Sequence, residues 1–348
     1  MGNPGKDVAL HTVMTSQTLR LKKAVKTIPG LNYLASVLKY DGMGGWVFQR
    51  PILQWICDPT LRQQLPGLYR FFGVYCQWFF DLTGAGYLRG GHLLFPMVAK
   101  FSNQQYLKLQ LPEFTVFLDA KDWRMFAVVH ELMSHKADTK ILSRYLSAGD
   151  TFLDVGANHG SFSIVASQLV ATQGKVIAIE PQPKLAKAIE LSLSENRFSP
   201  FQVHQIAVGD TEGEVELMIP KDTSGAAGLY QEHSGTQDYE KVTVPMKPFD
   251  ALDWQSLPGR VVMKLDVEGC EYRFLNGARK MIAARKPILI MEINPDTLKA
   301  ARTPAAEMKQ LLRELGYVQY AEMRSLDQVL PIEQLDAGTW RNIVLFAN

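Results

Sequence analysis

Gly156 and Glu180 are the two residues whose types and spacing point most directly to a binding site. Gly156 begins the glycine turn Gly-Ala-Asn-His-Gly, which ends at Gly160 and follows an apolar run, 151–155, that predicts a buried parallel strand. Glu180 ends the next apolar run, 176–179. A strand, a glycine-rich turn, a helix and an acid at the tip of the next strand form a nucleotide-binding unit. The helix N-terminus offers unpaired N–H groups, and Glu180 is placed to accept hydrogen bonds from both hydroxyls of a ribose.

The composition of this turn indicates which ribose-bearing ligand it suits. The turn lacks the middle glycine of the dinucleotide pattern Gly-x-Gly-x-x-Gly, which lets the backbone approach a pyrophosphate. A looser turn preceded by an acid suits a positively charged ligand without phosphate, and S-adenosylmethionine (SAM) is such a ligand. NAD(P) and an ordinary turn without a ligand are the alternatives. The residues predicted here to bind the cofactor are Asp154, Gly156, Ala157, Asn158, Gly160 and Glu180.

Acidic and amide side chains gather at the predicted carboxyl ends of the strands, where ligands bind in such sheets. They are Asp154, Glu180, Asp266, Glu268, Glu292 and Asn294. Lys264, Asp266 and Glu268 alternate along one strand, so they share a face with neighbours about 7 Å apart. A lysine in a central strand is costly unless it is paired. Either the three form a self-satisfied ion-pair cluster, or Asp266 lies beside the methionine part of SAM while Glu268 and Glu292 face the acceptor.

Methyl transfer from a sulfonium requires an aligned acceptor and a group that removes its proton. A carboxylate whose pKa is raised by neighbouring carboxylates can do this. Glu268 is therefore the first candidate for the base and Glu292 the second, and Lys264 completes the predicted catalytic set. Mg²⁺ held by Asp266, Glu268, Glu292 and Asn294 is the less favoured alternative, so no metal ligand is predicted.

Three further features have open assignments. His159 lies at the mouth of the turn and either acts as a base or, as we favour, is a residue that begins the helix. Asp210 either reaches the adenine amino group or belongs to a turn. The long polar loop 221–240 is predicted to cover the substrate, because loops of this length are usually lids or disordered.

Five sequence blocks, in this order, resemble the FkbM family of SAM-dependent methyltransferases. They are Asp154–Gly160, Ile179–Pro181, Ala207–Gly209, Lys264–Gly269 and Met291–Ile293. The resemblance covers residues 105–348. It implies a class I methyltransferase fold, methyl transfer to a hydroxyl of a sugar, glycolipid or natural product, and contacts from Ala207 and Val208 that flank the adenine.

Three other functions remain as alternatives. An NAD(P)-linked oxidoreductase shares this topology, although the altered glycine turn argues against it. A non-catalytic SAM-binding scaffold is the second. The third, a nucleic-acid methyltransferase, is not expected, because Asn294-Pro295 is followed by Asp296 rather than by the Pro-Tyr of a base-flipping motif. The predicted acceptor is a hydroxyl-bearing small molecule or glycan.

Cysteine usage and the N-terminal sequence bear on location. The chain of 348 residues has three cysteines, Cys57, Cys76 and Cys270, an odd number without metal-binding spacing. They favour a reducing compartment over a disulfide framework. The start of the sequence is not followed by the apolar run of a signal peptide. These features predict a cytoplasmic protein.

The charge of the chain is unevenly distributed. Residues 1–100 carry 11 Lys or Arg and 4 Asp or Glu, whereas the whole chain has a net charge of only +2. A basic N-terminal region suggests an anionic partner or a membrane periphery; a solvated basic face is the alternative that we favour. The aromatic segment Leu68–Phe80 is too short and polar to span a bilayer. It is predicted to pack on the main domain, with an interfacial or substrate-binding role as the alternative.

The order of predicted elements indicates an α/β protein. Residues 1–104 are predicted as a mainly helical region, including an amphipathic helix at 19–38, and residues 105–348 as the methyltransferase domain. A hairpin is expected within 105–119 and another from 215–219 and 242–246. From residue 152 strands and helices alternate, which predicts a Rossmann-like, mostly parallel sheet. The seven strands are expected at 152–155, 176–179, 203–208, 261–267, 288–293, 317–322 and 343–346, with single helices at 270–285 and 307–315.

Overall fold

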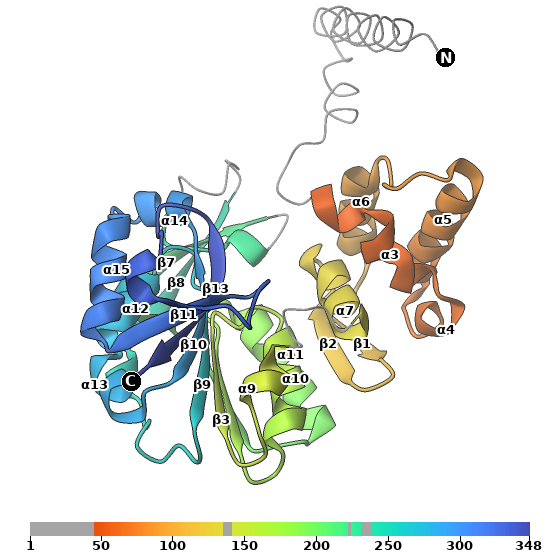
Figure 1. The fold of residues 1–348 in the computed structure, drawn as a ribbon. Helices are drawn as coiled ribbons and strands as arrows, with labels where there is room; N and C mark the ends of the chain where they lie inside the picture. The colour runs from red at the N-terminus through yellow and green to blue at the C-terminus, as the bar shows by residue number, and fades with distance from the viewer. Residues whose placement is uncertain (1–44, 135–140, 222–223, 231–238) are drawn as a thin grey trace, which may run out of the picture.

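The computed structural model describes residues 45–134, 141–221, 224–230 and 239–348. Its centre is an eight-stranded sheet with the strand order β12-β11-β13-β10-β9-β3-β4-β5 (Figure 1). The strands are β3 (Thr151–Val155), β4 (Lys175–Ile179), β5 (Phe201–His204), β9 (Val261–Leu265), β10 (Ile288–Ile293), β11 (Tyr317–Glu322), β12 (Val329–Pro331) and β13 (Arg341–Ala347).

The sheet has the predicted class but one more strand than predicted. The strands β5, β4, β3, β9 and β10 are parallel, and β13 runs antiparallel between β10 and β11. The Rossmann-like, mostly parallel α/β fold is therefore confirmed. The count of seven strands is wrong, because β12 pairs with β11 at one edge. A strand of three residues is too short to show an alternating hydrophobic pattern.

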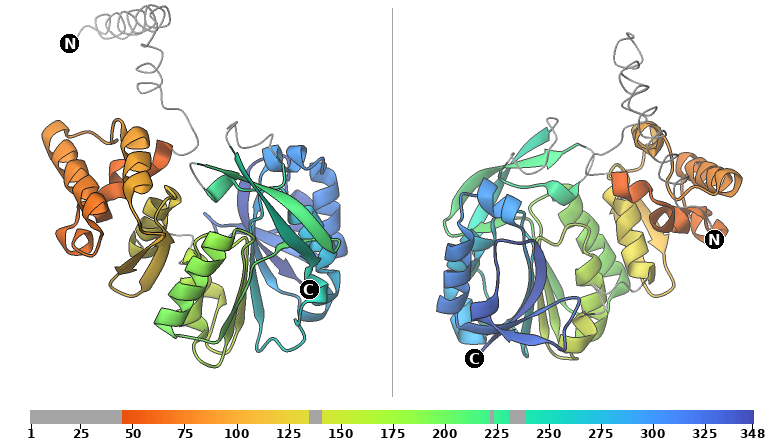
Figure 2. Two further views of the ribbon diagram at one scale, coloured as in Figure 1. Left: turned by 180° about the vertical axis from the view of Figure 1, so that it is seen from behind. Right: turned by 45° about the horizontal axis from the view of Figure 1, so that its top comes forward.

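Helices cover both faces of this sheet, as the two views in Figure 2 show. Alternate residues of each strand point to opposite faces: Phe152 belongs to one hydrophobic core, whereas Leu153 and Val155 belong to the other. The helices on the first side are α7 (Arg124–Ser134), α9 (Leu142–Tyr145), α10 (Ser161–Val170) and α11 (Pro183–Asn196). Those on the second are α12 (Glu271–Gly277), α13 (Arg279–Arg285), α14 (Pro295–Ala300) and α15 (Ala305–Glu314).

Two predicted elements are divided in the structure. The strand expected at 203–208 ends at His204, and Ala207–Gly209 forms β6 of a separate sheet with β7 (Gly213–Pro220) and β8 (Tyr239–Pro248). The predicted hairpin is the antiparallel β7–β8 pair. The helix expected at 270–285 is interrupted at Ala278, where φ is −118° and ψ is 13°. Hydrophobic periodicity continues across such a break, so the sequence does not reveal it.

The described part of the N-terminal region is helical and shares a core with one side of the sheet. Its elements are η1 (Gly45–Phe48), α3 (Arg50–Cys57), α4 (Pro59–Arg62), α5 (Gly67–Thr83) and α6 (Gly91–Phe101), followed by the predicted hairpin of β1 (Tyr106–Gln110) and β2 (Thr115–Asp119). The helix expected at 19–38 lies outside the described residues. The boundary at residue 104 stays a prediction.

Side chains of α11 join the hairpin to the main sheet. Ser192 accepts a hydrogen bond from the backbone N–H of Phe117 at 2.9 Å, and Asn196 exchanges two hydrogen bonds with the backbone of Thr115. They satisfy backbone groups at an edge of the hairpin that no strand covers. Within the described residues, no helix has both the length and the apolar character needed to cross a membrane.

Candidate functional site

A cavity of about 350 Å³ opens at the carboxyl ends of the parallel strands, which is where ligands bind in open α/β sheets. Residues that follow β3, β4 and β9 line it, together with residues of β10, parts of α7 and the segment that begins with η2 (Ser224–Ala226). The predicted site residues that line it are Gly156, Ala157, Asn158, Glu180, Ala207, Val208, Lys264, Asp266, Glu268 and Glu292. Asp154 and Gly160 are not among the lining residues.

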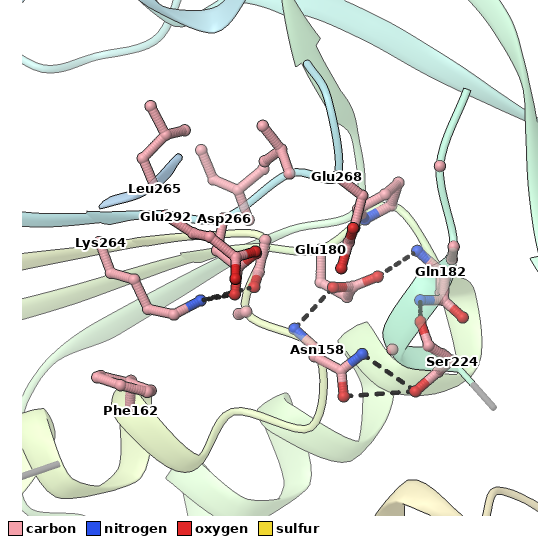
Figure 3. A pocket seen from close by; sticks show the side chains of 18 of the residues that line it. Asn158, Phe162, Glu180, Gln182, Ser224, Lys264, Leu265, Asp266, Glu268 and Glu292 are labelled. Atoms are coloured by element: carbon pink, nitrogen blue, oxygen red, sulfur yellow. Dashed lines mark hydrogen bonds and ion pairs between the residues drawn. The ribbon is translucent and has the colours of Figure 1, made fainter. Parts of the chain in front are cut away.

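Glu180 is held by two backbone N–H groups at one end of this cavity (Figure 3). One carboxylate oxygen accepts from the N–H of Asn158 at 2.7 Å, and the other accepts from the N–H of Gln182 at 3.0 Å. Burial raises the pKa of Glu180 to about 7, although these two N–H groups oppose the rise. Each oxygen has a second lone pair, so the carboxylate retains the capacity to accept two hydroxyl donors.

Packing accounts for both glycines of the turn. Gly156 has a φ of +80°, and a Cβ atom there would lie 1.8 Å from the carbonyl oxygen of Asp266. Gly160 has a φ of +78° at the start of α10, and its Cβ would lie 2.9 Å from Ile189. Left-handed backbone and close approach both favour glycine. Gly156 therefore keeps the two central turns in contact, whereas Gly160 fits α10 against α11.

Asp154 lies below the cavity and is fully buried. One of its oxygens accepts a hydrogen bond from Ser163 at 2.6 Å. The other has no hydrogen-bond partner among the described residues and lies 3.9 Å from Lys264 Nζ. Burial raises the pKa of Asp154, and Lys264 partly offsets the rise. This carboxylate contacts the lysine and α10 instead of the cavity.

Lys264 is paired, as its position in a central strand requires. Its ammonium group donates to Asp266 at 3.1 Å and to the Gly156 carbonyl at 3.3 Å, and it lies 5.3 Å from the ring centre of Phe162. Burial lowers the pKa of Lys264, but Asp266 and Asp154 outweigh it and the net pKa is raised. Lys264 is therefore a permanent cation and is unsuited to accept a proton.

Three carboxylates meet at the other end of the cavity. Asp266, Glu268 and Glu292 each offer an oxygen, and these oxygens lie within 4.8 Å of one another. Burial and then the charges of Asp266 and Glu292 raise the pKa of Glu268 well above its usual range. Burial, with a smaller contribution from the charge of Asp266, raises the pKa of Glu292 to about 7. The structure thus brings together the two predicted base candidates.

The loop that presents Glu268 is held by another acid. The buried carboxylate of Glu271 accepts from the backbone N–H groups of Val267 and Gly269, at 3.2 Å each. Glu268 itself has a φ of +48°, in the left-handed region that disfavours most side chains. Our sequence analysis did not select Glu271, although an acid in the first turn of a helix is a recognisable signal.

The remaining candidates have structural partners. His159 Nε2 lies 2.8 Å from Asp122, and both residues are buried. Asp210 pairs with Arg273 at 2.8 Å and is not among the cavity-lining residues. Asn294 caps α14 by accepting from Asp296 N–H, and it too is absent from the lining. Asn294 thus does not join the acidic cluster.

Several cavity residues were missed because distant segments supply them. Ser224 accepts from the side chain of Asn158 at 3.0 Å, and its carbonyl accepts from Gln182 at 3.4 Å (Figure 3). Trp340 donates to Glu292 at 2.6 Å. No local motif marks these contacts. The lid predicted for 221–240 stays a prediction, since 222–223 and 231–238 lie outside the described residues.

The comparisons with known proteins agree with this geometry. Residues 154–318 match the family model described as the methyltransferase FkbM domain. This part of the chain is an FkbM methyltransferase domain. The predicted resemblance is confirmed over those residues, and the chain is a SAM-dependent methyltransferase. No match is found among curated proteins.

Solved structures match the chain at low similarity. An FkbM methyltransferase from Methylobacillus flagellatus has 15% identity and a TM-score of 0.37, over 81% of this chain and 72% of that one. M. jannaschii TYW2 in complex with AdoMet has 12% identity and a TM-score of 0.35, over 71% and 87%. A SAM-dependent O-methyltransferase from Thermotoga maritima has 14% and 0.31, over 70% and 87%. At these scores the three structures carry no argument about the acceptor.

Proposed function

We propose that the FkbM domain transfers the methyl group of SAM to a hydroxyl group of a sugar, glycolipid or natural product. The observation that carries the proposal is the cluster of Asp266, Glu268 and Glu292, with two raised carboxyl pKa values, in the same cavity as Glu180. A hydroxyl is a weak nucleophile whose proton must be removed as it reacts, and a carboxylate of raised pKa is suited to accept it.

The cofactor end of the cavity fits SAM in three respects. Glu180 retains acceptor capacity for the two ribose hydroxyls, and the apolar side chains of Ala207 and Val208, which line the cavity, suit an adenine ring. Asp266 supplies a negative charge toward the sulfonium and amino groups. We assign Asp154 and Gly160 to positioning, because neither lines the cavity. When bound, SAM supplies an electrophilic methyl group on a positively charged sulfur.

The reaction follows from the position of the carboxylates. The acceptor oxygen forms a C–O bond as the methyl C–S bond breaks, S-adenosylhomocysteine leaves, and Glu268 takes the hydroxyl proton. Glu292 maintains the raised pKa of Glu268 by its charge and is itself oriented by Trp340. Lys264 fixes Asp266 and keeps its own proton throughout.

Mg²⁺ is the alternative occupant of the acidic cluster. Its oxygen ligands lie about 2.1 Å from the ion in near-octahedral geometry, so neighbouring oxygens are about 3 Å apart. The three carboxylate oxygens lie close enough together to hold a cation, but Asn294, the expected fourth ligand, caps α14 and is absent from the cavity lining. We therefore assign the cluster to proton transfer and propose a reaction without a metal.

Two experiments test the proposal. Calorimetric titration with S-adenosylhomocysteine and with NADH measures cofactor preference, and we expect binding of the former alone. Incubation with methyl-labelled SAM and a panel of monosaccharides, glycolipids and polyketide alcohols is expected to yield an O-methyl ether. A product methylated on carbon or nitrogen would overturn the assignment of a hydroxyl acceptor but would leave the assignment of SAM as cofactor unchanged. Binding of NADH alone would overturn both.

A further inference from the structure

The helix α5 has two apolar faces, and only one of them packs against the part of the chain that the structure describes. Tyr69, Phe72, Cys76 and Phe80 are buried in the core shared with α7. The opposite face carries large apolar side chains with exposed fractions of 41% to 70%: Leu68, Phe71, Val74, Trp78 and Leu82. We call these five residues the α5 stripe. A helix that is apolar all round is normally buried on all sides.

The spacing of the stripe makes it one continuous surface. Its members recur at intervals of three or four residues over about four turns, so they lie in a row along the helix. Polar side chains lie beside this row, and Arg70 and Asp81 are both exposed. The next helix, α6, adds exposed Met97 and Phe101 on either side of exposed Lys100. Contiguous exposed apolar surface of this kind marks an interaction site.

The charge of the helical region indicates which kind of partner the α5 stripe suits. Residues 45–104 contain five basic residues, Arg50, Arg62, Arg70, Arg89 and Lys100, against two acids, Asp58 and Asp81. A symmetric dimer through this helical region would bring together two surfaces with the same excess of basic residues. An anionic bilayer instead offers complementary charge together with an apolar interior. With 17 residues, α5 is shorter than the roughly 20 needed to span the bilayer core.

We propose that the α5 stripe docks this protein on anionic membrane surfaces, with Phe71 and Trp78 inserted at the interface and the neighbouring basic side chains contacting phospholipid headgroups. An interfacial helix places aromatic and aliphatic residues about 5–10 Å into the boundary between headgroups and acyl chains. The stripe lies on the outer side of the helical region, as the exposed fractions require. Figure 1 shows α5 remote from the sheet and at the outer edge of the molecule.

The test is sedimentation of the full chain with vesicles of phosphatidylcholine alone or mixed with phosphatidylglycerol. We expect binding to the anionic vesicles that weakens with salt. The double substitution Phe71→Ser, Trp78→Ser is expected to lower the partition coefficient at least about tenfold. The matched control, Met133→Ser, Val329→Ser, removes two apolar side chains that are exposed elsewhere and is expected to bind like the wild type. The double substitution Arg89→Glu, Lys100→Glu is expected to weaken binding to the anionic vesicles and to leave binding to phosphatidylcholine vesicles unchanged.

A second measurement does not depend on the folding of these variants. Lipids brominated near the headgroup are expected to quench wild-type tryptophan fluorescence, and Trp78→Phe should remove most of the quenching. Equal vesicle binding by the stripe and control variants would overturn the proposal. A second result would also overturn it: the wild type does not bind vesicles but forms a dimer in light scattering, and the stripe substitutions dissociate this dimer. Binding of S-adenosylhomocysteine is unaffected in either case, so the result is separate from the proposed reaction.

Discussion

The two ends of the cavity hold their carboxylates in different ways. At one end, Glu180 accepts two backbone N–H groups, at 2.7 and 3.0 Å, from the turn after β3 and the segment after β4. At the other, carboxylate oxygens of Asp266, Glu268 and Glu292 lie within 4.8 Å of one another, and burial together with the charge of Asp266 raises the pKa of both glutamates. The first end is organised by backbone donors and suits a ligand with fixed hydroxyl positions. The second brings several carboxylates together without such backbone donors and suits proton transfer.

The largest effect is expected from the acidic end. We predict that Glu268→Gln lowers kcat about 10²- to 10⁴-fold, because the amide cannot accept the acceptor's proton. The affinity for S-adenosylhomocysteine should change little, and calorimetry together with the labelled-methyl assay measures the two quantities. Glu190→Gln is the matched control, since Glu190 is exposed and pairs with Lys187. A variant that keeps its activity would remove Glu268 from the base role.

The next effect concerns the cofactor end. Glu180→Ala is predicted to weaken binding of S-adenosylhomocysteine by about 100-fold, because two hydroxyl acceptors are lost and two N–H groups lose their partner. Calorimetry provides the affinity, and a thermal melt without ligand reports whether the fold survives. Glu190→Ala serves as the control. Unchanged affinity in a folded variant would show that the ribose contacts another group.

A smaller effect is expected from pH. Because burial and neighbouring carboxylates raise the pKa of Glu268, with that of Glu292 at about 7, the base is protonated at low pH. The rate should therefore fall by up to about tenfold per unit as pH drops below the pKa of the base. Removing a charge with Glu292→Gln should lower the pKa of Glu268 and move the profile to lower pH. A shift in the opposite direction would contradict the proposed coupling.

The smallest effect is expected from metal removal. If the cluster transfers protons without an ion, treatment with EDTA should change the rate less than about twofold, and added Mg²⁺ should not restore activity to Glu268→Gln. Equilibrium dialysis followed by elemental analysis provides an independent measurement. If EDTA abolishes activity and added Mg²⁺ restores it, the acidic cluster is a metal site, and the proposed difference between the two ends of the cavity is wrong.

The sequence was most informative where chemistry follows from local order. A glycine turn after an apolar strand and an acid at the end of the next strand predicted one site for Asn158 and Glu180, and both line the cavity. The spacing of Lys264 and Asp266 predicted their pairing, which the structure shows, although β9 ends at Leu265 and not at the expected residue 267. The sequence was less informative about how deeply each side chain is buried. Asp154 was expected to contact the ligand, yet its side chain is fully buried below the cavity. Periodicity reports which face a residue occupies and not what covers that face.

The sequence by itself determined the alternation of strands and helices, the acids at the strand ends and the FkbM pattern, because each depends on residue type and short-range spacing. Only the tertiary structure decided that β9 lies between β3 and β10, which brings Asp266, Glu268 and Glu292 together. It also brought Trp340 to Glu292 through the antiparallel strand β13 and left the second apolar face of α5 exposed. Strand order, long-range pairing and burial depend on how the whole chain packs, so no local pattern specifies them.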